Sequence, residues 1–205
     1  MPERAEVQVF CDALQKNFGE ASILNIEYIG GRFLKENKQP IKLPINNIEF
    51  NARGKLLFVK SSDSDINLCF TLGMTGSFSP KRGKHSAIKF ETSKGGFFFD
   101  DIRHFGTFRI LNSFELENKL NKLKWDPLKE DYSKIIIGSI KKFSKKDICS
   151  ILLNQDIFSG VGNYLRAEIL YDSKISPFRK VENLTDTDIV NILKRGGDYE
   201  STFFT

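Results

Sequence analysis

Residues 154–170 read NQDIFSGVGNYLRAEIL and place two glycines directly before a run of helix-forming residues. The pattern predicts a helix that ends near Gln155, a tight turn that contains Gly160 and Gly162, and a second helix with Asn163 as its N-cap. The start of such a helix presents backbone N–H groups and the positive end of the helix dipole, which together can bind a phosphate. An ordinary helical hairpin, in which Asn163 is only a cap, fits the same residues.

Residues 3–114 are predicted to contain one helix followed by strands. Apolar side chains recur at helical spacing in residues 3–17, and Gly19 marks the expected end of that helix. Between residues 21 and 114, short apolar, β-branched and aromatic runs alternate with clusters of Gly, Asn, Ser and Pro. This spacing predicts about seven or eight strands of an antiparallel β-sandwich.

From about residue 115 onward the apolar residues follow the helical period instead. The sequence therefore predicts an α+β fold, in which an N-terminal helix and an antiparallel β-sandwich precede a helical domain. The expected boundaries are 1–115 for the N-terminal catalytic domain, 116–130 for a linker around WDPLKEDY and 131–205 for the helical domain. Residues 196–205, GGDYESTFFT, are expected to form a turn and a lone strand.

Composition limits the classes of partner. Lys and Arg number 31 against 26 acids, a net charge of +5, which permits a nucleic-acid partner without requiring one. The three cysteines, Cys11, Cys69 and Cys149, are far apart and form no CxxC pair, so neither a disulfide framework nor a zinc site is predicted. No apolar run approaches the length of a membrane span, and we expect an intracellular (cytoplasmic or nuclear) monomer with no membrane partner.

The opening of the chain and four internal strings together point to one family. In MPERAEV, Pro2 follows the initiator methionine, and the acids Glu3 and Glu6 come next. With TLGMTGSF, DIRHFG, the stretch quoted above and KISPF after it, this opening resembles the formamidopyrimidine-DNA glycosylase/endonuclease VIII (Fpg/Nei) family over residues 2–180. The resemblance implies a bifunctional DNA glycosylase and AP lyase of base excision repair, with a helix–two-turn–helix DNA-binding domain. It favours an endonuclease VIII-like member, because the purine-specific loop between the last helix and the tail is not found.

Pro2 is the candidate nucleophile. Removal of Met1 would expose a secondary amine, and α-amines have a reference pKa of about 7.7–8.0, so a useful fraction is neutral at physiological pH. Such an amine can attack a sugar C1′ carbon and form a charged iminium, which is already an electron sink. The resemblance implies that this residue displaces the damaged base and then promotes strand cleavage by β-elimination. A chance Met-Pro start is the alternative.

Glu3, Glu6 and Lys55 are further candidates for the catalytic centre, and Glu168 is a candidate DNA-binding residue. Glu3 is expected to carry the proton for base departure and ring opening, and Glu6 to orient a neighbour or bind sugar hydroxyls. The resemblance implies that Lys55 contacts the phosphate next to the lesion and that Glu168 helps to form the lesion side of the pocket. The alternatives are solvated acids on a helix dipole for Glu3 and Glu6, a hairpin-capping lysine for Lys55 and a helix-surface acid for Glu168.

Met74, Arg103 and Phe105 match the residues with which the family fills the gap left by an extruded base. A pliable thioether, a donor fork and an aromatic plate suit that task. Core packing is the alternative for Met74 and Phe105, and pairing with the two preceding aspartates is the alternative for Arg103. A flexible basic segment is expected to contact DNA phosphates through Lys81, Arg82, Lys84 and His85, and the resemblance implies a DNA contact for His85. A solvated basic loop is the alternative. Gly162 and Asn163 are expected to provide the helix terminus for a further phosphate.

One family feature is not matched. Relatives often end in a zinc β-hairpin held by four cysteines, and no cysteine follows Cys149, so no cofactor is expected in residues 1–205. Either the protein lacks this zinc, or the hairpin lies beyond residue 205, so the zinc and the second (δ) elimination stay open. The partner is expected to be damaged double-stranded or single-stranded DNA. A non-enzymatic DNA-binding protein with the same helix–two-turn–helix, or a general RNA-binding protein, is the alternative function.

Overall fold

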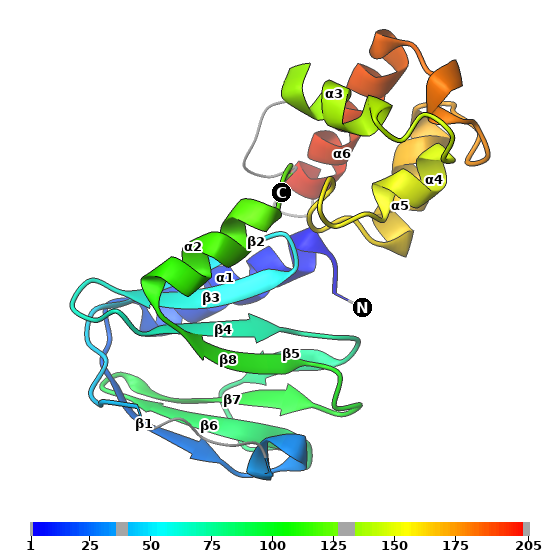
Figure 1. Cartoon of the computed structure of the whole chain (residues 1–205). Coiled ribbons are helices and arrows are strands. Elements are labelled where there is room, and N and C mark those ends of the chain that lie inside the picture. The colour runs from blue at the N-terminus through cyan, green and yellow to red at the C-terminus, as the bar shows by residue number, and fades with distance from the viewer. Residues whose placement is uncertain (1, 36–40, 127–133, 203–205) are drawn as a thin grey trace. The chain divides into compact units, whose positions relative to one another are not determined.

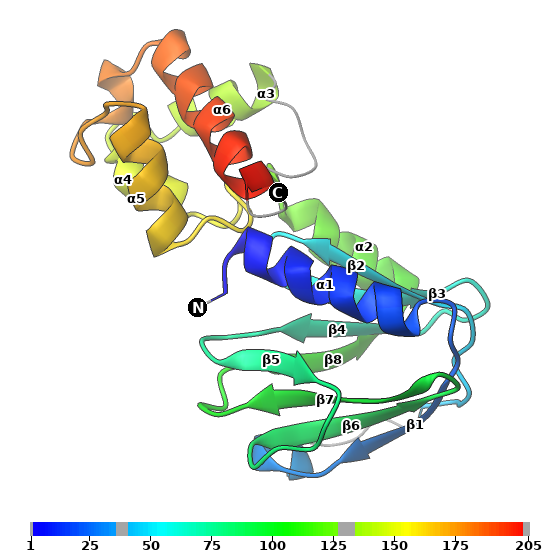
Figure 2. The same cartoon turned by 180° about the vertical axis from the view of Figure 1, so that it is seen from behind.

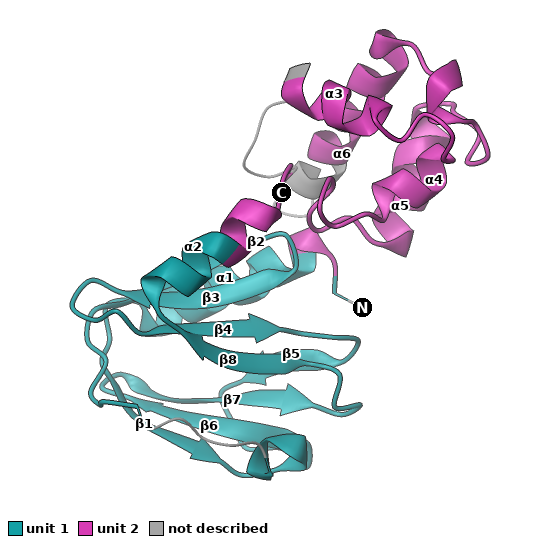
Figure 3. Ribbon diagram, in the orientation of Figure 1, with its two compact units in different colours: residues 1–2, 6–118 teal, residues 3–5, 119–205 magenta. Residues whose placement is uncertain are grey.

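The computed structural model describes residues 2–35, 41–126 and 134–202 (Figure 1), with the side chains of residues 134 and 199–202 excepted. The chain divides into two compact units (Figure 3). The sandwich unit contains residues 1–2 and 6–118, and the helical unit contains residues 3–5 and 119–205. Residues 3–5 therefore group with the helical unit rather than with the N-terminal part of the chain. The division at residue 118 falls inside a helix, and residues 127–130 of the expected linker lie outside the described residues.

The sandwich unit confirms the predicted helix and antiparallel sandwich. It begins with α1 (Arg4–Phe18), of which residues 6–18 belong to this unit. The strands are β1 (Ile23–Tyr28), β2 (Ile48–Arg53), β3 (Leu56–Ser61), β4 (Asn67–Thr71), β5 (Gly76–Ser79), β6 (Ser86–Thr92), β7 (Gly95–Asp101) and β8 (Thr107–Leu111), with the 3₁₀ helix η1 (Gly31–Leu34) between β1 and β2. They form two four-stranded antiparallel sheets with the orders β1-β6-β7-β5 and β2-β3-β4-β8.

Phenylalanine side chains join the two sheets into one core. Phe70 on β4 packs against Phe78, Phe90 and Phe99, which come from the three strands β5, β6 and β7 of the other sheet. The burial of these rings accounts for the strong preference of this sequence for Phe, since Phe has no polar group that must find a partner. Figure 2 shows α1 beside β2, where the backbone N–H of Phe50 donates to the side chain of Gln15.

The helical unit has a separate core around Trp125, Phe158 and several Ile and Leu side chains. Its elements are α3 (Lys134–Lys141), α4 (Ile148–Leu152), α5 (Asn163–Asp172), the 3₁₀ helix η2 (Val181–Asn183) and α6 (Asp186–Thr202), while α2 (Ser113–Lys122) contains the division between the units. The helix predicted to end near Gln155 ends at Leu152 instead. No helix in the described part of the chain is long and apolar enough to cross a membrane.

The prediction of a turn and a strand in residues 196–205 is wrong as far as Thr202, and residues 203–205 lie outside the described residues. Helix α6 continues through both glycines of the GGDYEST segment as far as Thr202. A Cβ atom on Gly196 would lie 2.9 Å from the ring of Trp125, so this glycine lets the helix approach the indole closely. Packing against the core of the helical unit thus outweighs the low helix propensity of the Gly-Gly pair.

Candidate active site

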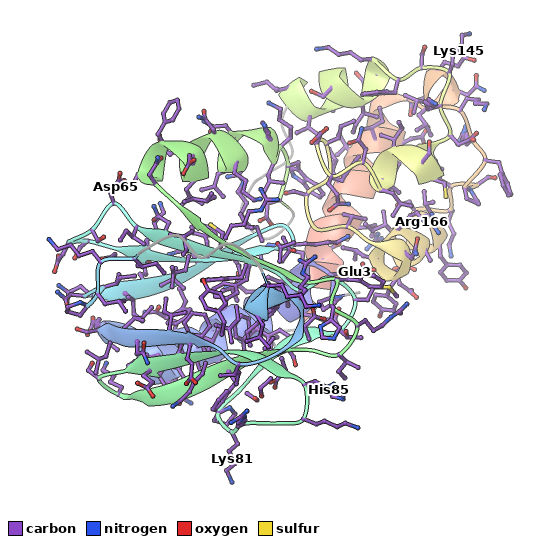
Figure 4. The ribbon with its side chains drawn as sticks, turned by 60° about the horizontal axis from the view of Figure 1, so that its bottom comes forward. Glu3, Asp65, Lys81, His85, Lys145 and Arg166 are labelled. Atoms are coloured by element: carbon purple, nitrogen blue, oxygen red, sulfur yellow. The ribbon has the colours of Figure 1, made fainter. Side chains whose placement is uncertain are left out.

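The carboxylate of Glu3 caps helix α5 within the helical unit (Figure 4). Glu3 Oε2 accepts hydrogen bonds from the backbone N–H groups of Gly162 and Leu165 at 2.9 and 3.0 Å, and Oε1 accepts one from Tyr164 at 3.0 Å. Glu3 is only 9% exposed. The N-terminal turn of α5, predicted to present its N–H groups to a phosphate, therefore holds an anion that the chain itself supplies.

The prediction that Asn163 caps α5 is wrong. Asn163 is the first residue of the helix, and Gly162 occupies the N-cap position. A glycine has no side-chain acceptor, and Glu3, 159 residues earlier in the chain, provides one. A Cβ atom on Gly162 would lie 2.1 Å from Glu3 Oε1, so the absence of a side chain makes room for the carboxylate. The side chain of Asn163 is exposed.

Arg4 and Asp126 form a buried ion pair that was not predicted from the sequence. Arg4 Nε donates to both Asp126 oxygens at 2.8 and 2.9 Å, and both side chains are fully buried. The backbone N–H of Arg4 donates to the carbonyl oxygen of Gly160 at 3.2 Å. Gly160 has a φ of +103°, and a Cβ atom there would lie 2.6 Å from Arg4 Cβ. No sequence spacing relates residues 4 and 126, so no local signal could have found this pair.

These contacts fix the first residues of α1 in the helical unit. Glu3 and Arg4 are held by α5, by Gly160 and by Asp126, and Pro2 directly precedes them as a half-buried residue. Glu6 belongs to the sandwich unit and is exposed. The opening residues of the chain are therefore divided between the two units.

Lys55 and Glu168 lie in different units. Lys55 follows Gly54 in the turn between β2 and β3 of the sandwich unit and is half-buried. Glu168 lies on α5 of the helical unit and is also half-buried. Their predicted roles at the lesion stay predictions.

Two loops of the sandwich unit bring Met74, Arg103 and Phe105 together. Met74 lies in the β4–β5 turn, and Arg103 and Phe105 lie in the β7–β8 loop. A Cβ atom on Gly73 would lie 2.5 Å from the backbone carbon of Phe105, so the two loops touch through their backbones. Met74 is 45% and Phe105 55% exposed, which excludes core packing for both.

Arg103 does not pair with the aspartates that precede it. Within the described ranges Arg103 makes no ion pair, and its guanidinium carbon lies 5.1 Å from the centre of the Phe105 ring. A cation in this position is attracted by the ring face. The side chains of Arg103 and Phe105 thus form an exposed cation–π pair.

The predicted basic segment is the loop that connects β5 to β6, two strands that both pair with β7. Figure 4 shows Lys81 and His85 on this loop. The cationic or titratable side chains of the loop are all exposed: Lys81, Arg82, Lys84 and His85.

No group of three or more His, Cys, Asp or Glu side chains that could hold a metal is found among residues 2–35, 41–126 and 134–202. Cys11, Cys69 and Cys149 lie on α1, β4 and α4 and do not form the four-cysteine set that the family resemblance implies. The described residues therefore do not fit a structural zinc ion.

Comparisons with known proteins bear on both units. Residues 1–108 match the family model described as the formamidopyrimidine-DNA glycosylase N-terminal domain, and residues 123–196 match the formamidopyrimidine-DNA glycosylase H2TH domain. The chain is 34% identical over 209 residues to the formamidopyrimidine-DNA glycosylase of Ureaplasma parvum, with 95% of this chain and 75% of that protein covered. It is 30% identical over 207 residues to the enzyme of that name from Mycoplasma genitalium, with 95% and 72% covered.

A solved structure shares the fold. The wild-type Lactococcus lactis Fpg, in a complex with DNA that contains an oxidised pyrimidine, superposes with a TM-score of 0.83 at 24% identity, covering 98% of this chain and 79% of that one. The relatives do not resolve the endonuclease VIII-like subtype, which stays a prediction. Two family models, two relatives of at least 30% identity and the shared fold agree with the Met-Pro-Glu opening, and the chain belongs to the formamidopyrimidine-DNA glycosylase/endonuclease VIII family.

Proposed function

We propose that the protein is a bifunctional DNA glycosylase and AP lyase of base excision repair that uses Pro2 as its nucleophile. The observation that carries the proposal is the anchoring of Glu3 and Arg4, since it holds the residues that directly follow Pro2. Consecutive Cα atoms lie about 3.8 Å apart, so the proline stays next to a buried, hydrogen-bonded carboxylate. Preorganisation of this kind reduces the entropy lost on reaching the reactive geometry.

The reaction needs the amine, proton transfers and one water molecule, which hydrolyses the final iminium. The Pro2 nitrogen forms a bond to C1′ while the bond between C1′ and the base breaks, and the leaving base takes a proton. Opening of the sugar ring then gives an iminium between Pro2 and C1′. Loss of a proton from C2′ expels the 3′ phosphate, and hydrolysis of the iminium releases the sugar and regenerates the amine.

Glu3 is the proposed proton carrier for base departure and ring opening because it is the carboxyl group adjacent to Pro2 in the chain. The three N–H groups of α5 hold its carboxylate in one orientation. Glu6 is proposed to orient a neighbouring group, Lys55 to contact the phosphate beside the lesion, and Glu168 to line the lesion side.

Residues of each unit are proposed to contact DNA. Met74, Arg103 and Phe105 are proposed to fill the gap left by an extruded base, which costs a few kcal/mol to unstack. The β5–β6 loop with Lys81, Arg82, Lys84 and His85 is proposed to contact phosphates. Because Glu3 already occupies the N–H groups of α5, the exposed Asn163 amide beside Gly162 is the proposed phosphate donor at that helix. Binding as a monomer, to damaged single- or double-stranded DNA within the cell, is part of the proposal.

Oxidised bases are the proposed substrates. The two relatives are named for formamidopyrimidine, whereas the solved Lactococcus lactis complex contains an oxidised pyrimidine. An endonuclease VIII-like member would favour oxidised pyrimidines, and a formamidopyrimidine-type member would favour oxidised purines. Excision rates on duplexes that carry one oxidised pyrimidine or one oxidised purine distinguish the two.

Borohydride trapping on abasic-site DNA tests the chemistry. We expect the natural chain to give a covalent adduct that maps to its N-terminal peptide by mass spectrometry. Pro2→Gly should change the rate of trapping, and a Gly-Ser extension before Pro2, which turns the amine into an amide, should abolish it. Retention of Met1, or an adduct of equal yield on the extended chain, would assign the nucleophile elsewhere, most simply to a lysine. A non-enzymatic DNA-binding protein would give no adduct at all.

A further inference from the structure

Strand β7 ends in two consecutive aspartates whose roles the proposed reaction leaves unexplained. Successive side chains of a strand point to opposite faces, so Asp100 and Asp101 contact different surroundings. Neither pairs with Arg103, the nearest cation in sequence, within the described ranges. Anionic side chains close to DNA-contacting loops repel phosphates, so their presence there calls for a structural reason.

Asp101 ties together the two loops that carry the gap-filling residues. Its side chain is fully buried, and Oδ2 accepts a hydrogen bond from the backbone N–H of Gly106 at 2.7 Å. Oδ1 accepts one from the hydroxyl of Thr75 at 3.2 Å, and the same hydroxyl oxygen accepts the backbone N–H of Arg103 at 3.0 Å. One carboxylate and one hydroxyl thus connect the turn beside Met74 with the loop that contains Arg103.

Asp100 closes the base of the basic β5–β6 loop. Its Oδ1 lies 2.5 Å from the hydroxyl of Ser86, and its Oδ2 lies 2.6 Å from the hydroxyl of Ser79. Ser86 Oγ also accepts the backbone N–H of Gly83, inside the loop, at 2.8 Å. Ser79 and Ser86 flank the loop on its two sides, so Asp100 holds both ends of the segment with the cationic side chains.

We propose that Asp100 and Asp101 are two separate positioning residues, one for each DNA-contacting element. Asp100 orders the phosphate-contacting loop, and Asp101, through Thr75, orders the gap-filling loops. The inference rests on the proposed function, because it assigns the DNA contacts to these loops. It predicts that the two aspartates affect different measurable properties, although they are neighbours in one strand.

The proposed role of Asp101 is tested with two matched substitutions at Thr75. Thr75→Val removes the hydroxyl and keeps the shape, whereas Thr75→Ser keeps the hydroxyl. Loss of one such hydrogen bond should lower the affinity for duplex DNA with an abasic site by about threefold to tenfold. The difference in affinity between duplexes with different bases opposite that site should fall by a similar factor. Trapping on single-stranded abasic DNA should stay unchanged, since that strand has no gap and no orphaned base. Thr75→Ser should restore the duplex value, and Asp101→Asn should reproduce the loss.

The proposed role of Asp100 is tested with the substitutions Asp100→Asn and Ser86→Ala. Because log Kd depends linearly on log salt concentration with a slope set by the number of phosphate contacts, a disordered basic loop should reduce that slope by roughly 1 to 2. The ratio of duplex to single-strand trapping should be preserved. Ser77→Ala is the control, because Ser77 lies opposite Asp100 in the β5–β7 pair but its hydroxyl makes none of the hydrogen bonds of Asp100 or Asp101 described above.

The outcomes separate the possibilities. The proposal is supported if the Thr75→Val and Asp101→Asn variants change the affinity for duplex, the Asp100→Asn and Ser86→Ala variants change the salt dependence, and Thr75→Ser keeps the duplex affinity of the natural chain. If the Asp100 and Asp101 variants change duplex affinity and salt dependence equally, the cause is a general loss of packing and the proposal is overturned. The proposal is also overturned if none of these variants changes either property. Failure of the natural chain to form any adduct on single-stranded abasic DNA would count against the proposed function itself, and the salt and duplex measurements on binding would still test the two aspartates.

Discussion

Gly162→Ala tests whether Glu3 caps α5. The backbone of Gly162 has φ −122° and ψ −161°, an extended conformation that alanine also adopts, so the substitution introduces no backbone strain. The added Cβ would lie 2.1 Å from Glu3 Oε1 and 2.3 Å from Cδ, both far inside van der Waals contact. The carboxylate must therefore leave, while the helix itself can stay.

The magnitude follows from the hydrogen bonds that are lost. Gly162 and Leu165 are buried, so when the carboxylate moves, two of its three N–H donors are left in a poorly hydrated place. A buried donor without an acceptor costs about 1–3 kcal/mol, and loss of a helix N-cap costs about 0.5–2 kcal/mol. We expect a local destabilisation of about 3 kcal/mol, which is roughly a 100-fold change in an equilibrium constant.

Amide hydrogen exchange at Tyr164 and Leu165 is the suitable measurement, because a chain of two units need not unfold in one step. Gly138→Ala is the matched control in the same unit. Gly138 is exposed on α3, nothing lies within 4 Å of the position that an added Cβ would take, and alanine should stabilise that helix by about 0.5–1 kcal/mol. Unchanged protection of both amides in Gly162→Ala would refute the cap, and an equal loss in Gly138→Ala would show that the effect is unspecific.

Two other features of the helical unit give predictions. Arg4→Met should destabilise that unit by about 3–5 kcal/mol because it removes the guanidinium that pairs with the fully buried carboxylate of Asp126. The double variant with Asp126→Leu should recover part of the loss. Lys145→Met, at an exposed pair, should cost at most about 1 kcal/mol, and thermal unfolding measures all three variants. Backbone and side-chain hydrogen bonds from Thr185 hold the pKa of Asp188 below its usual 3.8. The stability this gives α6 is therefore present above about pH 4 and is lost as the pH falls through the lowered pKa; amide exchange from pH 5 to 3 should show the loss, and Asp188→Asn should flatten the curve.

The elements of the fold followed from local patterns. Residues 163–172 have the helical period, and α5 spans Asn163–Asp172. The strands between residues 21 and 114 follow from β-branched and aromatic runs between turn residues, which specify extended backbone without any knowledge of the partner strand. The prediction from sequence fails at the Gly-Gly pair of residues 196–197, because local helix propensity is weak beside packing and Trp125 lies far from this pair in sequence.

The candidate site could be foreseen only as a set of residues. The Met-Pro-Glu opening and the loops with Met74 and Phe105 are visible in the chain, since they are short strings with characteristic chemistry. Their surroundings are not visible, because hydrogen-bond partners are set by distance in space. The rule that a helix is capped by the residue before it selected Asn163, whereas the acceptor is Glu3.

By itself, the sequence determined the family, the order of helices and strands and the identity of the chemical groups, because periodicity, turn chemistry and short motifs act over neighbouring residues. Only the tertiary structure decided that residues 3–5 belong to the helical unit. There Glu3 accepts hydrogen bonds from the N-terminal N–H groups of α5, and Arg4 pairs with Asp126, which lies 122 residues later in the chain. A buried charge is stable only where another part of the chain supplies its partners, and no local pattern can specify which part that is.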